Sequence, residues 1–247
     1  MNEFQSRNQQ HYEQQPGWQQ QPGAFGSYGA ETAALAGVEE RMGFIRKVYA
    51  LFFAATLFAI GGVMLGLSFE PLLRFAFEHP IIMFLAMIGG VMGAQAVRHV
   101  RGLNLVALFG FTTFTGVVIS PLIAVILQIN PGSILAAGLL TVGIFGGLTA
   151  YVFVSKKDFS FMRGMLMTGL IVVILAGVAN IFIGSGALGF AGAAAALLLF
   201  SGFVLYDTSN IIRRYPVNEY VAGALDLYLD AFNIFLALLR ILNAGRR

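Results

Sequence analysis

Three aspartates near the C-terminus are the residues of this 247-residue chain whose type and setting could do chemistry. Asp207 lies in the stretch FVLYDTSNIIRRYP, and Asp226 and Asp230 lie one helical turn apart in the apolar stretch GALDLYLDAFNIFLALLRIL. A charged carboxylate at the centre of a bilayer costs about 2.5–3.5 kcal/mol, so such residues usually mark an ion pathway, a proton relay or a paired site. All other carboxylates lie in the N-terminal segment or in connections between apolar runs.

The spacing of these acids predicts that they meet. The residues PVN at 216–218 predict a turn, and Asp207 lies ten residues before Val217, with Asp226 nine and Asp230 thirteen residues after it. At about 1.5 Å per residue, an antiparallel hairpin brings all three acids to within about one turn in depth. Two such carboxyl groups share a proton, because adjacent negative charges repel and burial disfavours ionisation. Arg98 is either a topology anchor or a cation that neutralises the acids.

The elements that position these residues are membrane helices. The chain is 57% hydrophobic and only 11% charged, against about 25% charged residues in soluble domains. Charge-free runs reach or exceed the roughly 18 residues of a candidate span, and the alternation of a β-barrel is absent. Turn chemistry in QINPGS and GSGALG divides the two longest runs. The sequence therefore predicts an all-α polytopic membrane protein with seven spans, near 44–67, 80–98, 103–127, 133–155, 161–183, 187–212 and 220–242.

The rest of the chain sets domain organisation and topology. Residues 1–38 are rich in Gln and poor in aliphatic side chains, which predicts a disordered tail before a membrane domain at 39–247. Eleven of the 15 Lys and Arg residues fall on the side of the N-terminus, which predicts a cytoplasmic N-terminus. This distribution explains the net charge of +3 by topology, with no nucleic-acid partner.

Motifs of soluble enzymes are missing from the sequence. There is no cysteine, no Gly-x-Ser-x-Gly, no P-loop and no His-Glu-x-x-His, and the three histidines are scattered. We therefore expect no enzymatic activity, no cofactor and no clustered metal site. Small residues at the spacing Gly-xxx-Gly occur at 62–66, 89–93 and 143–147, and predict close helix packing.

The motif LYDTSNIIRRY, followed after a short turn by GALDLYLDAFNIFLALLRIL, resembles the Bax inhibitor-1 family of transmembrane proteins. The similarity covers about residues 40–244, and FTGVVISPLIAV at 114–125 is similar to the third span of the family. The resemblance implies seven helices with the C-terminal helix in the centre. It also implies a pH-sensitive calcium leak, with calcium and protons as the transported and sensed ions and the lipid bilayer as the surroundings.

Carried over by position, the resemblance implies that Asp207 and Asp230 form a proton-sharing dyad that gates the pore and binds calcium transiently. It implies that Arg98 pairs with Asp207, while Asp226 matches an acid of some members only. We assign Asp226 and Tyr206 supporting roles. One departure is Met87, which stands where a bacterial relative has a glutamate. We expect a bacterial cytoplasmic membrane protein.

Three alternatives remain open. Tyr206-Asp207 matches the first motif of presenilin-like intramembrane proteases, but residues 227–230 read LYLD instead of Gly-x-Gly-Asp and the Pro-Ala-Leu element is missing. A second alternative is an interaction protein that binds membrane protein partners, such as a protease or a cell-death factor, through the Gln-rich tail. A third is a cation/proton exchanger.

Overall fold

The computed structural model describes residues 37–244, and it is helical along most of this range. The predicted tail at 1–38 lies almost entirely outside the described residues. The helices are α2 (Val38–Ser68), α3 (Glu70–Glu78), α4 (Pro80–Ala96), α5 (Leu103–Ile129), α6 (Gly132–Ser155), α7 (Arg163–Ile183), α8 (Gly186–Arg213) and α9 (Tyr220–Asn243), with a short 3₁₀ turn, η1 (Ser160–Met162), before α7. The all-helical prediction is confirmed.

Long apolar runs form these helices because every backbone polar group must be satisfied internally where water is absent. Five segments are long and apolar enough to cross a membrane: α2, α5, α6, η1 with α7, and α8. A sixth results if α3 and α4 count as one span, although they are bent by 95° at His79. The chain is thus a multi-pass membrane protein by length and composition, while the seventh predicted span, α9, is not among these segments.

The predicted helix boundaries are close to the observed ones because the turn residues act as expected. Gly184 ends α7 in the left-handed conformation, with φ at 66°, which glycine adopts without a steric penalty. Ser185 then caps α8 by accepting a hydrogen bond from the Leu188 amide at 3.3 Å. The main element that the sequence prediction left out is α3, a short helix that lies between the first two predicted spans.

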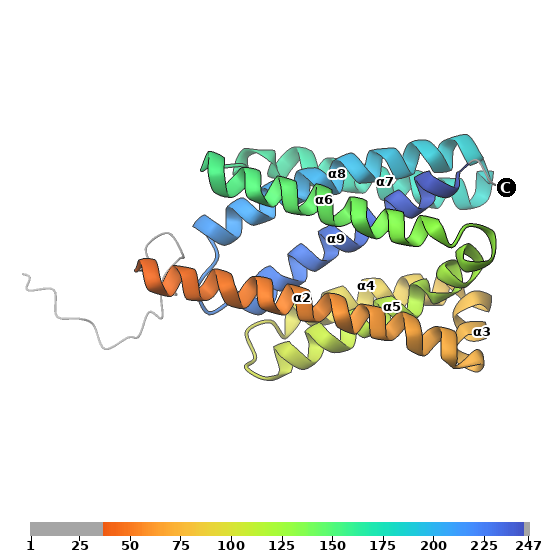
Figure 1. Ribbon diagram of the computed structural model, residues 1–247, viewed down its shortest axis with the longest axis horizontal. Coiled ribbons are helices and arrows are strands. Elements are labelled where there is room, and N and C mark those ends of the chain that lie inside the picture. The colour runs from red at the N-terminus through yellow and green to blue at the C-terminus, as the bar shows by residue number, and fades with distance from the viewer. Residues whose placement is uncertain (1–36, 245–247) are drawn as a thin grey trace, which may run out of the picture. The chain divides into compact units, whose positions relative to one another are not determined.

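One helix, α9, runs obliquely between two groups of helices (Figure 1). It contacts α6 and α8 of one group and α2 and α5 of the other. It is also rich in buried residues, including Leu227, Ile234 and Leu239, which have no exposed surface. Among the described residues, the acids of α9 are therefore surrounded by protein.

The closest helix approach joins α2 and α5. A Cβ atom on Gly62 would overlap the Thr113 carbonyl, and one on Gly116 would overlap the Ala59 carbonyl, so these backbones touch. The predicted close packing is confirmed for Gly62 and for Gly66, which faces Ser120. It is wrong for the pairs at 89–93 and 143–147, where an added Cβ would meet nothing within 4 Å.

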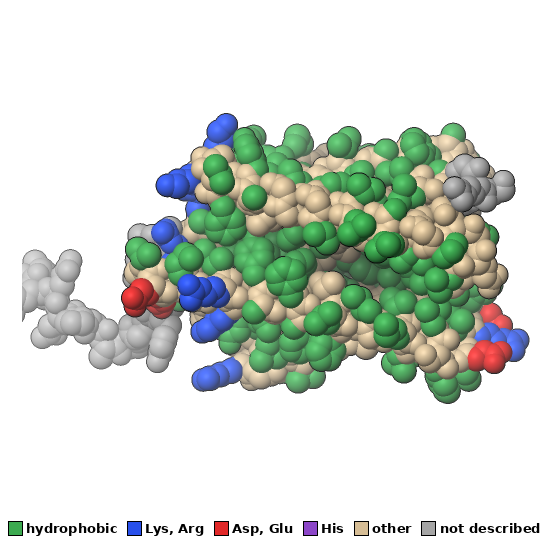
Figure 2. All heavy atoms as spheres, viewed as in Figure 1, with side chains coloured by type: hydrophobic (Ala, Val, Ile, Leu, Met, Phe, Trp, Pro, Cys, Tyr) green, Lys and Arg blue, Asp and Glu red, His purple; other side chains and the backbone are tan. Residues whose placement is uncertain are grey.

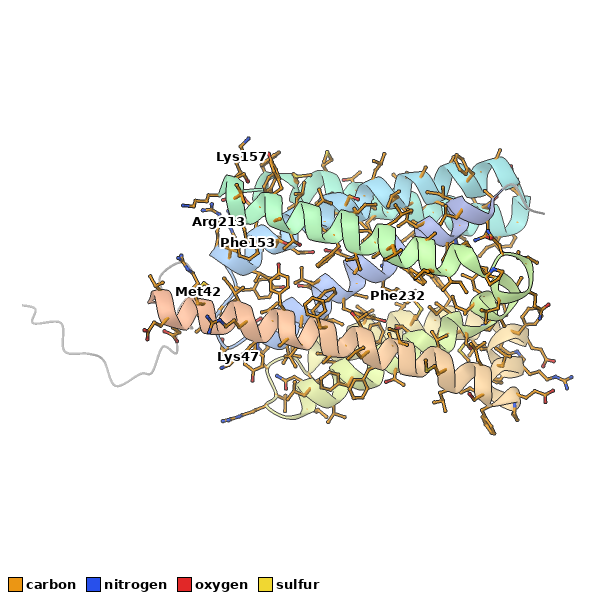
Figure 3. The ribbon with its side chains drawn as sticks, in the orientation of Figure 1. Met42, Lys47, Phe153, Lys157, Arg213 and Phe232 are labelled. Atoms are coloured by element: carbon orange, nitrogen blue, oxygen red, sulfur yellow. The ribbon has the colours of Figure 1, made fainter. Side chains whose placement is uncertain are left out.

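The charged side chains gather at the two ends of the bundle (Figure 2). Lys47, Lys157 and Arg213 come from three different parts of the chain and lie at one end (Figure 3). Helix α3 lies at the opposite end (Figure 1) and carries the pair Arg74–Glu78, with Nε and Oε1 2.7 Å apart. The charges are thus separated from the apolar middle, as in a membrane protein.

Candidate functional site

The candidate site is a cluster of three carboxyl groups between α8 and α9. Asp207 lies on the last two turns of α8, and Asp226 and Asp230 lie one turn apart on α9. Asp230 is 3% exposed, whereas Asp207 and Asp226 are partly buried. The turn between Arg213 and Tyr220 folds α9 back onto α8, as the residues at 216–218 predict.

Asp207 and Asp230 face each other across the two helices. Each of the two carboxyl groups is near enough to influence the other, and the charge of Asp226 acts on both of them. The Asn210 amide also lies beside Asp207. Oδ2 of Asp230 is buried without a hydrogen-bond partner among the described residues. Placing three neighbouring carboxyl groups in such a setting is costly unless hydrogen bonds, protons or cations offset their mutual repulsion.

Asp226 is the best hydrogen-bonded of the three acids. The Gln95 amide of α4 donates to its Oδ1 at 3.4 Å, and the Tyr215 hydroxyl donates to its Oδ2. Tyr215 belongs to the turn between α8 and α9, and burial, followed by the charge of Asp226, raises the pKa of its hydroxyl well above the usual value. Tyr215 therefore stays a hydrogen-bond donor at neutral pH.

The partner of Arg98 in the structure is Glu219. The Arg98 Nε lies 3.8 Å from Glu219 Oε2, and His99 Nδ1 lies 3.5 Å from Oε1 of the same carboxylate. Arg98 Nε also donates to His99 Nε2 at 3.0 Å. The expected pairing with Asp207 is not among the ion pairs of residues 37–244; the charge of Arg98 acts on Asp226 instead.

The structure thus brings Asp207, Asp226 and Asp230 together and places Arg98 at the edge of the cluster. Tyr206, predicted as supporting, is partly buried on α8, and its hydroxyl makes no hydrogen bond with any described residue. Met87, which stands in place of a relative's glutamate, packs against the hydrophobic core.

Two contacts of the cluster were missed by sequence reasoning. Gln95 is the polar residue in the otherwise apolar stretch 80–96, which was a signal that it faces protein. Tyr215 precedes the predicted turn, so the count that paired the acids could also have placed it near Asp226.

Further buried hydroxyl groups lie beside the carboxyl cluster, on neighbouring residues of α8 and α9 and on the helices that pack against them. The hydroxyls of Thr115 on α5 and Tyr228 on α9 are hydrogen-bonded to each other. Hydroxyls of Tyr49, Thr149 and Thr208 come together from α2, α6 and α8. Within the described residues no group of three or more His, Cys, Asp or Glu side chains is placed to hold a metal ion.

Comparison with known proteins identifies the family. The family model described as inhibitor of apoptosis-promoting Bax1 matches residues 41–247. Mouse protein lifeguard 4 is 35% identical over 221 residues, covering 88% of this chain and 91% of the mouse protein. The Golgi anti-apoptotic protein of vaccinia virus strain Lister is 32% identical, covering 90% and 93% of the two chains.

Bacterial proteins are similar as well. An uncharacterized protein of Campylobacter jejuni is 38% identical over 206 residues, covering 81% of this chain and 88% of the relative. An uncharacterized membrane protein of Vibrio cholerae is 40% identical over 165 residues, covering 66% and 74% of the two chains. These matches confirm the resemblance stated from the motifs around Asp207 and Asp230: the chain belongs to the Bax inhibitor/lifeguard family of membrane proteins.

Proposed function

We propose that the protein is a pH-sensitive calcium leak whose gate is the carboxyl cluster of Asp207 and Asp230. The observation that carries the proposal is the placement of these two acids beside each other, Asp230 buried and Asp207 partly buried, with one oxygen of Asp230 lacking a partner among the described residues. Such a pair holds a proton when it is closed, because two adjacent charges in a low-dielectric site repel. Carboxylate oxygens are also suitable ligands for calcium, which would pass as the transported ion and not as a cofactor.

The gating step we propose is a change in proton occupancy of the pair. When the shared proton leaves, repulsion between Asp207 and Asp230 weakens the contact between α8 and α9. Arg98, which is paired with Glu219, would then set how much negative charge the cluster tolerates. Asp226 supports the site through its hydrogen bonds from Gln95 and Tyr215.

The proposal includes a membrane arrangement. Seven spans result if α9 and the bent pair α3–α4 both cross the membrane. In this arrangement, α9 is the central helix. The gathering of Lys and Arg at one end of the bundle supports a cytoplasmic location for that end and for the N-terminus. We place the protein in the bacterial cytoplasmic membrane, where its surroundings are lipid.

The test is calcium flux into proteoliposomes across about pH 5–8. We expect a pH-dependent leak in the wild type and an altered pH dependence in Asp207→Asn and in Asp230→Asn. Asp158→Asn is the matched control, because Asp158 lies in the connection between α6 and η1 outside the cluster. Flux with the wild-type pH dependence in Asp207→Asn contradicts the gate, and the absence of flux at every pH contradicts the leak.

A second candidate function is supported by the names of two relatives, protein lifeguard 4 and the Golgi anti-apoptotic protein. In this alternative, the chain binds another membrane protein and thereby modulates a protease or a stress or cell-death factor. Deleting residues 1–38 separates the two functions: a leak survives the deletion, whereas binding through the tail is lost. An exchanger would instead show calcium flux that depends on an imposed proton gradient.

A further inference from the structure

A hollow of about 520 Å³ lies between α5, α7, α8 and α9, away from the carboxyl cluster. It forms because α7 packs on α8, while α5 packs on α2, α3 and α4, so the two groups diverge. The hollow lies near the ends of α7 and α9 and the start of α8, which meet at the right-hand end of Figure 1. Its volume falls in the range of about 300–1,000 Å³ that is common for small-molecule sites.

The lining changes in polarity along the helix axes. Asn180, Ser185, Arg240 and Asn243 line the end of the hollow where α7 stops and α8 begins. Aliphatic side chains line the remainder, which reaches along α8 as far as Ala196. Ten residues separate Gly186 from Ala196, so the apolar part extends about 15 Å from the polar end. The ligand that fits such a gradient has a polar head and an apolar tail.

The charge of the hollow favours a ligand with an anionic head group. Arg240 is the charged residue among those that line it, and its side chain is exposed. The ion pairs found among residues 37–244 do not include Arg240, in contrast to Arg74 of α3, a helix at the same end of the bundle as the end of α9 (Figure 1). A guanidinium presents several donors in a fixed geometry that suits a phosphate group.

The surroundings of the hollow favour a ligand that comes from the lipid bilayer. Three of its walls, α5, α7 and α8, are helices that can cross a membrane. Ile129, Ile181 and Phe190 at its border expose about half or more of their surface, as expected of side chains that face acyl chains. We propose that this hollow binds an anionic phospholipid of the surrounding bilayer, with the phosphate on Arg240 and an acyl chain between α5 and α7.

The test is native mass spectrometry of the full chain, titrated in detergent with phosphatidylglycerol or phosphatidylcholine. We expect tighter binding of phosphatidylglycerol. Arg240→Gln should weaken that binding about fivefold, the effect of about one basic residue at an anionic surface, and leave phosphatidylcholine unchanged. Arg74→Gln is the matched control at the same end and should change neither.

A second variant tests the apolar part of the site. Gly177 lines the hollow and has open space around its Cβ position, so Gly177→Leu fills the hollow without disturbing the helix contacts. It should weaken binding of both lipids, whereas Gly146→Leu, which is equally open but lies outside the hollow, should not.

Three outcomes overturn the proposal. Equal losses in Arg240→Gln and Arg74→Gln show that phospholipid binds by general surface charge. In the second outcome, inorganic phosphate removes the preference for phosphatidylglycerol and Gly177→Leu has no effect on binding. This result shows that only an anion is bound. A dimer that dissociates in Gly177→Leu shows that a second copy of the chain, and not a lipid, fills the hollow.

Discussion

The α2–α5 and α8–α9 interfaces are both contacts between long helices, yet different chemistry holds each together. Along α2 and α5 the backbones touch at Gly62 and Gly116, with no charged group between them. Along α8 and α9 the carboxyl groups of Asp207 and Asp230 meet. The first interface depends on the close fit of the two backbones. In the proposed gate, the second contact depends on the proton shared by Asp207 and Asp230, so its strength changes with pH.

The largest effect on stability is expected from a substitution at the α2–α5 contact. Gly116→Ala places a methyl group against the Ala59 carbonyl, and we expect a loss of about 3 kcal/mol in the free energy of unfolding or failure to fold. Gly110→Ala on the same helix has open space and should be neutral or stabilising by up to about 1 kcal/mol. Thermal unfolding in detergent measures both, and equal melting temperatures of the two variants contradict the close contact.

At the α8–α9 interface, Tyr215→Phe removes the donor to Asp226 and leaves one oxygen of that carboxyl group without its hydrogen bond. We expect a loss of about 1–3 kcal/mol in the free energy of unfolding. Tyr151→Phe is the control, because Tyr151 is 46% exposed.

The raised pKa of Tyr215 predicts that the stability of the folded state depends on pH in the alkaline range. The raised pKa of folded Tyr215 means that the folded state keeps a proton that the unfolded chain loses above about pH 10. The stabilisation is therefore complete below about pH 10 and decreases above it. Wild-type protein should lose more stability than Tyr215→Phe between about pH 9 and 11, as followed by chemical denaturation. Parallel curves for the two proteins contradict the assignment.

A smaller effect is expected where α5 meets α9. Thr115→Val and Tyr228→Phe each remove one side of the same buried hydrogen bond, so each should cost about 1 kcal/mol. Their double variant should cost less than the sum, because the second change has no bond left to remove. Thr141→Val is the control, since the Thr141 hydroxyl donates only to the Ala137 carbonyl of its own helix. Strict additivity of the first pair would argue against a shared bond.

The smallest effect is expected at the exposed end. The hydrogen bond that the Ser160 amide donates to Asp158 at 2.9 Å is the largest cause of the lowered pKa of Asp158. The positive charge of Arg214 lowers this pKa further. A lowered pKa stabilises the folded state above the usual value near 4 and loses that contribution as the pH falls through the folded value. Asp158→Asn should cost at most about 1 kcal/mol at neutral pH and reduce the acid sensitivity below about pH 4. A larger loss would mean that this connection also supports the core.

Much of the fold could be predicted from the sequence because charge-free runs and turn residues are local signals. The apolar runs and the breaks at Pro131 and Gly184 set most helix ends correctly. The meeting of Asp207 with Asp226 and Asp230 followed from counting residues along a hairpin.

Other features depend on contacts between distant segments and were not predictable. The pairing of Arg98 with Glu219 depends on how the α4–α5 connection meets the start of α9, about 120 residues further along the chain. The open setting of Gly143 and Gly147 depends on which face of α6 meets its neighbours. Spacing within one helix cannot specify either contact.

The bend between α3 and α4 has a consequence for bilayer thickness. With 17 residues, α4 is about 25 Å long, which is shorter than the roughly 30 Å hydrocarbon core of a typical membrane. Phe75 and Phe77 of α3 are exposed beyond its N-terminal end, where aromatic rings suit the headgroup layer. If α3 lies along the headgroup layer and α4 alone crosses the hydrocarbon core, α4 is too short for a bilayer of typical thickness. This hydrophobic mismatch favours a thin bilayer or local thinning of the bilayer around α4.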